Sequence, residues 1–357
     1  MQTAGALVGT VRGRRLCYEL AQRGSLGQEV RCSMGREAER VDEERGNLGR
    51  SSVFLISVTA DGSVPVLPPA RALGEVLTAA APAVIVHAGD LLAALSRTVA
   101  SAMYWQPPDA EDIVLARPAI RAALLPIAEL VVGDRGARWW STLLDRGAQV
   151  RTRFEAARAP VPQGTPSERL RRWRDAVVEQ ERSATSHGGA WWVTPALAGL
   201  DLTTRALGEA GSVALWATED ELGWTFADLT PCAIDPAARV LEIDGPDAWA
   251  SLVATYPLEV TSSRGPGWWD AVDPHDGDWA IPDWSAVATE YDGVHVSVLA
   301  WLTTSGQAVP VGPGTMTTLA GWDPDATWWL TDAVHEVAHG RRWVRDDLNW
   351  LPSAVTR

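Results

Sequence analysis

The sequence predicts an α+β fold, with a small N-terminal α/β layer followed by a tryptophan-rich domain that holds a curved, mainly antiparallel sheet. Three observations support this prediction. Short β-branched apolar runs alternate with segments of helical spacing in the first half of the chain. Short strands bounded by turn residues dominate the second half. Fifteen of the nineteen tryptophans come after residue 184, so the second half also differs in composition.

The N-terminal part divides into a charged extension and an α/β domain. Within residues 1–50, GREAERVDEERGNLGR is typical of a solvated helix or of a tail without fixed structure. VFLISV (53–58) and AVIVHA (83–88) are apolar runs bounded by Gly, Pro and Asp, a pattern typical of buried strands. We therefore expect an α/β domain over residues 51–160, with helices in ARALGEVLTAA, GDLLAALSRTVASAM and PAIRAALLPIAELVV.

A Pro/Gly break at 160–166 predicts a domain boundary. After it, an Arg-rich helix capped by Ser167 is expected to form a solvated connection over residues 161–183. Residues 184–357 then form the tryptophan-rich domain. Its strands are expected in GGAWWVTP, SVALWAT, RVLEID, LEVTSS, GVHVSVLAWL and TMTTLAGW, and its short helices in PDAWASLVATYP and PDWSAVATEY.

Composition excludes several classes of function. The formal net charge of -14 argues against a general nucleic-acid binder, because such proteins neutralise phosphates with Lys and Arg. All 31 basic residues are arginine, as expected of a GC-rich genome. A Schiff-base lysine, a P-loop lysine and a kinase ATP lysine are therefore excluded. The three cysteines have no paired spacing, and no leader or membrane segment is evident, so we expect a cytoplasmic protein without disulfides.

A first candidate site lies around Tyr291-Asp292-Gly293, where a helix leads into a strand. Asp292 and His295 flank a glycine that allows close backbone approach. On the strand, Gly293 and His295 share one face and Asp292 lies on the other. A carboxylate at a strand entrance beside a histidine suits acid/base chemistry or ligand binding. The alternative is a turn aspartate and a structural histidine.

Two further candidates are suited to an anionic, planar ligand. SHGGAWWVTP places His187 before two glycines and then Trp191 and Trp192, of which one can stack on a ring while the other packs in the core. Arg205 and Arg264 each lie among Thr, Ser and Gly, a setting suited to phosphate or carboxylate. The alternative for both arginines is an ion pair with one of the 45 acidic residues.

HEVAH (335–339) has the spacing that places two zinc ligands on one helix face. His335 and His339 would bind the metal, with Glu336 as general base. Its continuation lacks a third ligand, because position 345 is Arg. The alternative is a partly exposed terminal helix without metal.

GGAWWVTP, WSAVATEYDGVHV and LAGWDPDATWWL together resemble the ADP-ribosyltransferase fold over roughly residues 184–330. The G-G-x-W-x-[ST] segment is similar to the second strand of that fold. The resemblance implies a split, curved sheet that grips NAD in a cleft.

The resemblance also implies site residues. His187 matches the His-Gly of the first motif, and Trp192 with Thr194 matches the second. Glu290 or Asp292 matches the carboxylate, which stabilises an oxocarbenium-like state as nicotinamide leaves or orients the acceptor.

These patterns predict an enzyme that acts on a nucleotide or another anionic small molecule, with ADP-ribosyl transfer or NAD hydrolysis as the specific reaction. Asp292 and His295 would be catalytic, Arg205 and Arg264 would hold the anion, and a tryptophan from 191–192 would stack on the ring. One alternative is a zinc-dependent hydrolase that uses HEVAH. The other is a non-catalytic binding protein, such as an antitoxin, immunity or assembly component, whose tryptophans form an exposed apolar patch that docks a protein partner.

Overall fold

The computed structural model describes residues 4–46, 71–84, 86–104, 106–155, 162–184, 190–220, 223–272, 277–347 and 349–353. The predicted strand VFLISV and the candidate residue His187 lie outside these ranges. The chain divides into two compact units. The first unit comprises Met1–Thr98 and Gln106–Arg138, and the second comprises Val99–Trp105 and Trp139–Arg357.

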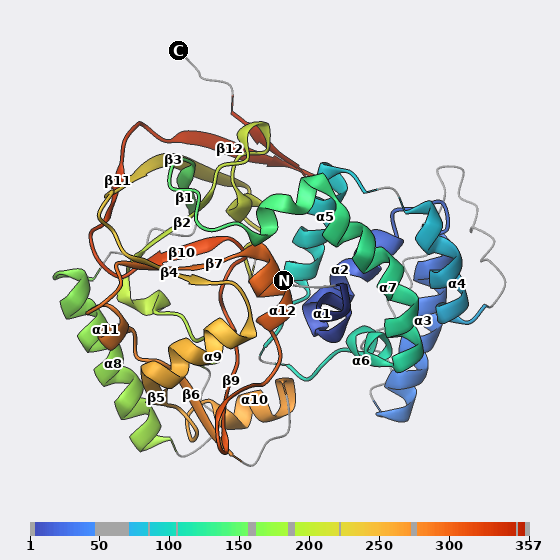
Figure 1. Ribbon diagram of the computed structural model, residues 1–357, viewed down its shortest axis with the longest axis horizontal. Helices are drawn as coiled ribbons and strands as arrows, with labels where there is room; N and C mark the ends of the chain where they lie inside the picture. The colour runs from blue at the N-terminus through green and yellow to red at the C-terminus, as the bar shows by residue number, and fades with distance from the viewer. Residues whose placement is uncertain are drawn as a thin grey trace. The chain divides into compact units, whose positions relative to one another are not determined.

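In the described residues of the first unit, every regular element is a helix (Figure 1). The elements are α1 (Ala4–Gly9), α2 (Val11–Ala21), α3 (Gly27–Glu44), α4 (Leu73–Ala80), η1 (Ala81–Ala83), α5 (Ala88–Ala100), α6 (Ala110–Ala116), α7 (Pro118–Gly133) and the 3₁₀ helix η2 (Arg135–Ser141), of which α5 and η2 extend into the second unit. The three helices expected from spacing are confirmed as α4, α5 and α7. The first unit therefore has a helical core.

The strand predicted for AVIVHA is wrong. Its first residue ends η1, where Pro82 occupies one of the first helical positions, and its last residue begins α5. Short apolar runs of this length fit a buried connection between helices as well as a strand, and Val84 is buried in that way. The α/β layer predicted for this part of the chain is therefore not formed by the described residues.

Residues 4–46 are a folded part of the first unit. Residues 35–44 are helical, because α3 continues to Glu44, but the helix buries one face and is not solvated all round. Val30, Met34, Ala38 and Val41 follow one another at helical spacing and are all buried. A tail without fixed structure is excluded for these residues.

Helix α2 carries buried charge through the first unit. Arg15 on α2 lies 2.7 Å from Glu111 and 3.6 Å from Asp112, both on α6. Glu19, one turn further along α2, lies 3.6 Å from Arg15. These ion pairs connect α2 with α6 inside the helical core.

The second unit contains two sheets. In its described residues, the larger sheet has the strand order β13-β12-β3-β1-β2-β10-β7-β4, with β11 paired to β3, and the smaller has the order β5-β6-β9-β8. The strands are β1 (Gln149–Phe154), β2 (Asp201–Arg205), β3 (Phe226–Ile234), β4 (Val240–Ile243), β5 (Pro257–Glu259), β6 (Asp278–Pro282), β7 (Gly293–Val296), β8 (Val309–Gly312), β9 (Thr315–Thr317), β10 (Ala326–Trp329), β11 (Val334–Glu336), β12 (Arg341–Asp346) and β13 (Asn349–Pro352).

Strand pairing in these sheets is antiparallel except for β4 with β7 and β6 with β9. The helices of the second unit are α8 (Pro166–Ser183), α9 (Pro246–Thr255), α10 (Gly265–Ala271), α11 (Trp284–Val287), α12 (Val298–Thr304) and the 3₁₀ helices η3 (Ala196–Ala198), η4 (Gly208–Ala210) and η5 (Val213–Leu215). Mixed sheets together with separate helices confirm the α+β class (Figure 1).

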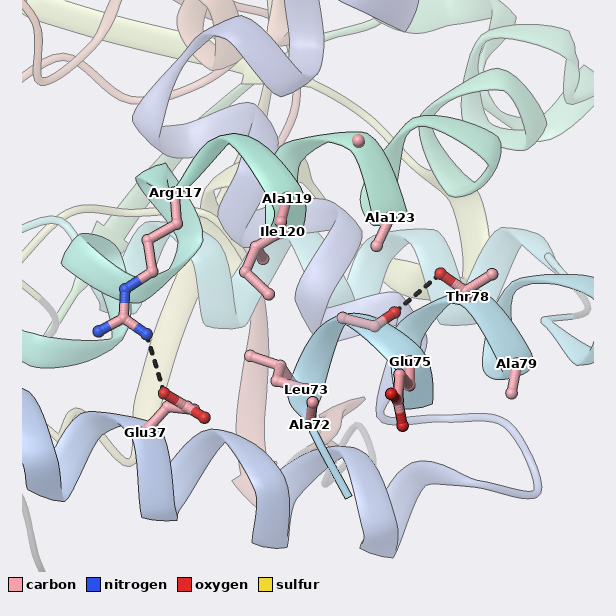
Figure 2. Close-up of a pocket in the computed structure, with 12 residues that line it drawn as sticks. Glu37, Ala72, Leu73, Glu75, Thr78, Ala79, Arg117, Ala119, Ile120 and Ala123 are labelled. Atoms are coloured by element: carbon pink, nitrogen blue, oxygen red, sulfur yellow. Dashed lines mark hydrogen bonds and ion pairs between the residues drawn. The ribbon is translucent and has the colours of Figure 1, made fainter.

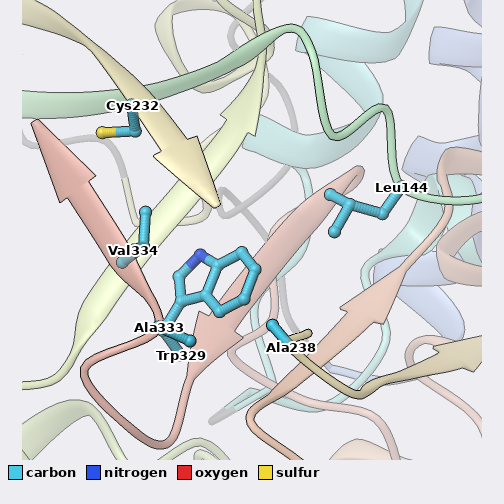
Figure 3. Packing of buried hydrophobic residues seen from close by; sticks show 6 residues of the cluster. All are labelled: Leu144, Cys232, Ala238, Trp329, Ala333 and Val334. Carbon is cyan, nitrogen blue, oxygen red and sulfur yellow. The ribbon is translucent and has the colours of Figure 1, made fainter. Parts of the chain in front are cut away.

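Tryptophans form much of the core of the second unit. Trp249, Trp284 and Trp322 are fully buried and their rings contact one another. Trp329 of β10 packs in a second cluster, where Figure 3 shows its ring facing Leu144 and Ala238. The binding-protein alternative predicts that Trp268, Trp269, Trp328 and Trp329 are exposed. Trp268 and Trp329 are buried and Trp328 is half-buried, while the side chain of Trp269 lies outside the described ones.

Several elements of the second half differ from the predictions. Residues 190–194 of the predicted strand GGAWWVTP form no strand, because the Val193 N–H bonds to the carbonyl of Ala320 outside any ladder. SVALWAT forms the 3₁₀ helix η5 instead of a strand. Strand β1 pairs with β2 and β3, so residues 149–154 belong to the second unit although the predicted boundary lay at 160–166.

Candidate functional site

The second unit contains a pocket of about 440 Å³, a size within the range of small-molecule sites. Helix α8 supplies one side of it, and residues 190–198 with Arg264 supply the rest. The lining residues are Pro162, Arg169, Arg172, Trp173, Ala176, Val177, Gln180, Ala190, Trp192, Leu197, Ala198 and Arg264. We call this the arginine pocket.

Helix α8 is fixed at its start by a capping box. The Thr165 side chain accepts from the Glu168 N–H, and the Glu168 carboxylate accepts from the Thr165 N–H, so Thr165 is the N-cap and not the predicted Ser167. Leu170, Trp173 and Val177 recur at helical spacing and are buried. The helix is therefore one wall of the unit, and the solvated connection predicted for 161–183 is wrong for its buried face.

A carboxylate of α8 also holds the turn that precedes Arg264. The two Glu181 oxygens accept from the backbone N–H groups of Ser262 and Ser263 at 2.6 and 2.8 Å. Arg264 itself begins the turn into α10, with its N–H bonded to the carbonyl of Val260. These bonds fix the backbone that carries Arg264 into the pocket lining.

Arg264 is a buried cation with unmatched donors. Its residue is 3% exposed, and no described residue accepts a hydrogen bond from its Nε or Nη1. Burial lowers the pKa of Arg264 to about 10, although the Glu181 carboxylate opposes this shift. At neutral pH the side chain is still protonated. An anion that enters the pocket would therefore gain a partly desolvated partner.

The other charged residues of the pocket lining are also arginines. Arg169 donates from Nη1 to the carbonyl of Gly199, while its Nε is buried without an acceptor among the described residues. Arg172 is exposed and donates from Nη2 to the carbonyl of Gln163. Among the described residues that line the pocket none is acidic, although the chain has 45 Asp and Glu against 31 Arg. The pocket is therefore electropositive within an acidic protein.

The two adjacent tryptophans have different roles. Trp191 stacks on Tyr104 with ring centroids 5.7 Å apart, and its carbonyl accepts from Trp268 Nε1. Trp192 lines the pocket and is half-buried. Thr194, which the resemblance also implied, is buried and is not a lining residue. Both indoles are half-buried, but Trp191 is engaged by Tyr104, whereas Trp192 lines the pocket and is available to a planar ligand.

A second cluster brings together His295 and Arg205, two of the predicted site residues. His295 on β7 is fully buried, and its Nδ1 donates to Glu242 of β4 at 2.6 Å. Its Nε2 lies 3.6 Å from Oδ1 of Asp325. Arg205 on β2 donates its backbone N–H to Asp325 and lies 3.0 Å from Asp145 through Nη1.

Both ring nitrogens of His295 face carboxylates, Glu242 at Nδ1 within hydrogen-bond distance and Asp325 at Nε2 at ion-pair distance. Burial lowers the pKa of His295, but the neighbouring carboxylates of Asp325 and Glu242 outweigh burial and raise the pKa to about 9. Arg205 is likewise paired with carboxylates, as one of the sequence interpretations had it. His295 and Arg205 are not lining residues of the arginine pocket. The cluster therefore suits a structural role near the β4 edge of the larger sheet.

The predicted acids Asp292 and Glu290 are not lining residues of the pocket either. Asp292 accepts from the Arg239 N–H at 2.8 Å and from the Thr331 hydroxyl at 3.0 Å. Glu290 is exposed. Beside them, Gly293 makes room for the Trp329 ring, since a Cβ there would lie 3.0 Å from it. The space that Gly293 leaves beside its backbone is thus filled by the Trp329 side chain and not by a ligand.

HEVAH does not lie on a helix. Its first two residues belong to β11, which pairs with β3, so His335 and His339 do not project from one helix face as predicted. Glu336 forms ion pairs with Arg151 and Arg153, with Arg153 Nη2 at 2.6 Å. Among the described residues, no group of three or more His, Cys, Asp or Glu has an arrangement that holds a metal ion.

Sequence reasoning missed Arg169, Arg172 and Glu181, because an Arg-rich helix is typically solvated. A usable signal was present: Arg169 and Arg172 are three residues apart and adjoin Trp173 and Ala176 on the same part of the helix. The arginines thus lie beside apolar residues on the helix surface, as expected for the wall of a pocket that binds an anion. Glu242 and Asp325 were also missed as partners of His295, because strand order decides those contacts.

The first unit has a pocket of different character, of about 860 Å³ between α3, α4 and α7. Figure 2 shows Leu73 and Ile120 facing each other within it and the ion pair of Arg117 with Glu37 at one end, at 2.8 Å. Alanines form much of its lining. Because its arginine is already paired, this pocket is the weaker candidate for an anionic ligand.

Comparison of the chain with family models, with curated proteins and with solved structures found no match. Within the described part of the chain, no helix combines the length and the apolar character that a membrane crossing requires.

Proposed function

We propose that the second unit binds a nucleotide or another anionic small molecule in the arginine pocket, and that the protein is an enzyme acting on that ligand. The observation that carries the proposal is Arg264, a buried guanidinium whose Nε and Nη1 find no acceptor in the described part of the chain, in a pocket whose described lining includes no acid. A bound anion would supply the missing acceptors and offset the cost of burying this cation. Trp192 supports a ligand with a planar ring, because its half-buried indole lines the same pocket.

For the reaction we propose ADP-ribosyl transfer or NAD hydrolysis, as the resemblance implies. NAD combines anionic phosphates with planar rings, which suits a pocket lined by arginines and a tryptophan. The resemblance implies Asp292 as the carboxylate that stabilises the oxocarbenium-like state as nicotinamide leaves. Asp292 does not line the arginine pocket, so its catalytic role is proposed on the resemblance alone.

Binding is tested by titrating NAD into the full chain while tryptophan fluorescence is recorded. We expect saturable quenching, and an Arg264→Gln variant that binds about tenfold more weakly or worse, since hydrogen bonds to charged groups contribute about 1.5–3 kcal/mol. Arg182→Gln is the matched control, because Arg182 lies on α8, pairs with Glu179 at 3.0 Å and does not line the pocket. Equal affinity in wild type and Arg264→Gln would overturn the site.

The reaction is tested separately by measuring nicotinamide release. We expect Asp292→Asn to abolish turnover while the fold, followed by circular dichroism, is retained. Full activity in that variant would remove Asp292 from the mechanism. Zinc content of the same preparation tests the alternative hydrolase, which requires stoichiometric metal that a His339→Ala variant loses.

A further inference from the structure

Two arginines of the pocket have buried nitrogens without an acceptor among the described residues, and the number of such arginines bears on the charge of the ligand. Arg264 has two buried nitrogens without a described acceptor, and Arg169 has one. The two side chains come from separate segments, Arg169 from the second turn of α8 and Arg264 from the turn before α10. Arg172 differs, because it is exposed to solvent and donates to the carbonyl of Gln163. Arg264 and Arg169 thus have donors available to a ligand, whereas the donors of Arg172 are largely satisfied by Gln163 and solvent.

The nearby carboxylates do not change this count. Glu181 is committed to the N–H groups of Ser262 and Ser263 through its two oxygens. Glu168 is committed to the capping box of α8, and its charge faces the exposed Arg172, where solvent screens the pair. Neither acid is a lining residue of the pocket. No described residue supplies the acceptors that these nitrogens of Arg264 and Arg169 lack, and a bound anion would supply them.

We propose, on the basis of the function proposed above, that the ligand carries two linked anionic groups, as in the diphosphate of a nucleoside diphosphate. Arg264 takes one phosphate at the buried end of the pocket, and Arg169 takes the other. The ring lies against Trp192, beside the apolar side chains of Val177 and Ala198. Arg172, at the exposed side, steers the anion during entry and contributes little to the bound state.

The test compares ADP, AMP and adenosine by isothermal titration calorimetry on the full chain. We expect ADP to bind about tenfold tighter than AMP or better, because it adds a charge-assisted contact to the second arginine. Arg169→Gln should remove most of that preference, so that ADP and AMP bind alike. Arg264→Gln should weaken both ligands. Arg172→Gln should weaken the binding of ADP and of AMP by a smaller and equal factor. This effect should disappear at about 0.5 M salt, where the electrostatic screening length is only a few ångströms.

The outcomes separate this inference from the function on which it rests. If AMP and ADP bind with equal affinity and Arg264→Gln weakens both, the pocket is a nucleotide site but the two-phosphate inference is wrong. If neither nucleotide binds, and Arg182→Gln and wild type are equally folded by circular dichroism, both proposals fail. An unchanged preference for ADP in Arg169→Gln also overturns the inference. Arg169→Lys, which keeps the charge, should retain part of the preference and so guards against a folding defect in the Gln variant.

Discussion

Arg15 in the first unit and Arg264 in the second are both buried, at 9% and 3% exposure, yet their surroundings are opposite. Arg15 has a carboxylate at 2.7 Å and three more within 4 Å. Burial acts to lower its pKa, but Glu111 and the other carboxylates outweigh burial and raise it above the ordinary value. Arg264 forms no ion pair with a described residue, and burial lowers its pKa to about 10.

This difference separates a structural cation from a candidate binding cation. A buried charge is tolerated when its partners lie within the protein, as around Arg15, and is costly when they do not. The cost at Arg264 is retained in the fold, because the Glu181 carboxylate offsets it only in part and no described residue accepts a hydrogen bond from its Nε or Nη1. We infer that Arg264 is kept at this position because a ligand supplies the counter-charge.

The largest expected effect is on Arg15. In Arg15→Met, we expect the free energy of unfolding of the first unit to fall by about 3–5 kcal/mol, because the carboxylates of Glu19, Glu111 and Asp112 lose their buried partner. Hydrogen exchange of the α2 amides measures this locally. A loss of less than about 1 kcal/mol would show that the cluster is not a structural ion network.

His295 extends the comparison, because it is a matched cation within the second unit. Its folded pKa of about 9 lies above the ordinary value of 6.5, so it contributes stability that is fully present below pH 6.5 and is lost as the pH rises through 9. The shift corresponds to roughly 3 kcal/mol. We expect denaturation curves of wild type to lose this contribution between pH 6.5 and 9, and His295→Gln to lack that decline. Parallel pH profiles in the two proteins would contradict the assignment.

Arg264→Met should behave in the opposite way to Arg15→Met. We expect its free energy of unfolding to be unchanged or raised by about 1 kcal/mol, since a buried, unmatched charge is replaced by an apolar side chain. Urea denaturation without ligand measures this. A destabilisation as large as that expected for Arg15→Met would place Arg264 among the structural cations and break the comparison.

The smallest effect is expected at the surface of α8. Arg182 pairs with Glu179 one turn away, and both side chains are mostly exposed. We expect Arg182→Gln to change the free energy of unfolding by about 0.3 kcal/mol or less. Thermal denaturation at low and high salt checks this. A clearly larger loss of unfolding free energy would indicate that an exposed arginine of this unit can matter as much to stability as a buried one.

Much of the local structure was predictable because its cause is local. Helical spacing and turn residues identified α4, α5, α7 and α9, since each buries one face that repeats every three to four residues. Short apolar runs were less informative. AVIVHA and HEVAH were assigned to the wrong element because a few residues fit several backbone conformations, and packing selects among them.

The candidate site was predictable in part. Arg264 and Trp192 were identified from residue type and turn context, and the arginine pocket brings them together. Asp292, Glu290, His295 and Arg205 were identified by the same reasoning but are not lining residues of that pocket. Residue type shows what a side chain can do, whereas its neighbours decide whether that capacity is already satisfied.

The sequence by itself determined the α+β class, the absence of lysine chemistry and the acidic charge, because these follow from composition and periodicity. Only the tertiary structure decided which cations are matched. Arg15 meets Glu111 across 96 residues of chain and His295 meets Glu242 across 53, whereas Arg264 meets no acid at ion-pair distance in the described residues. Those contacts arise from helix packing and strand order, which bring distant residues within a few ångströms and exclude the water that would otherwise screen them.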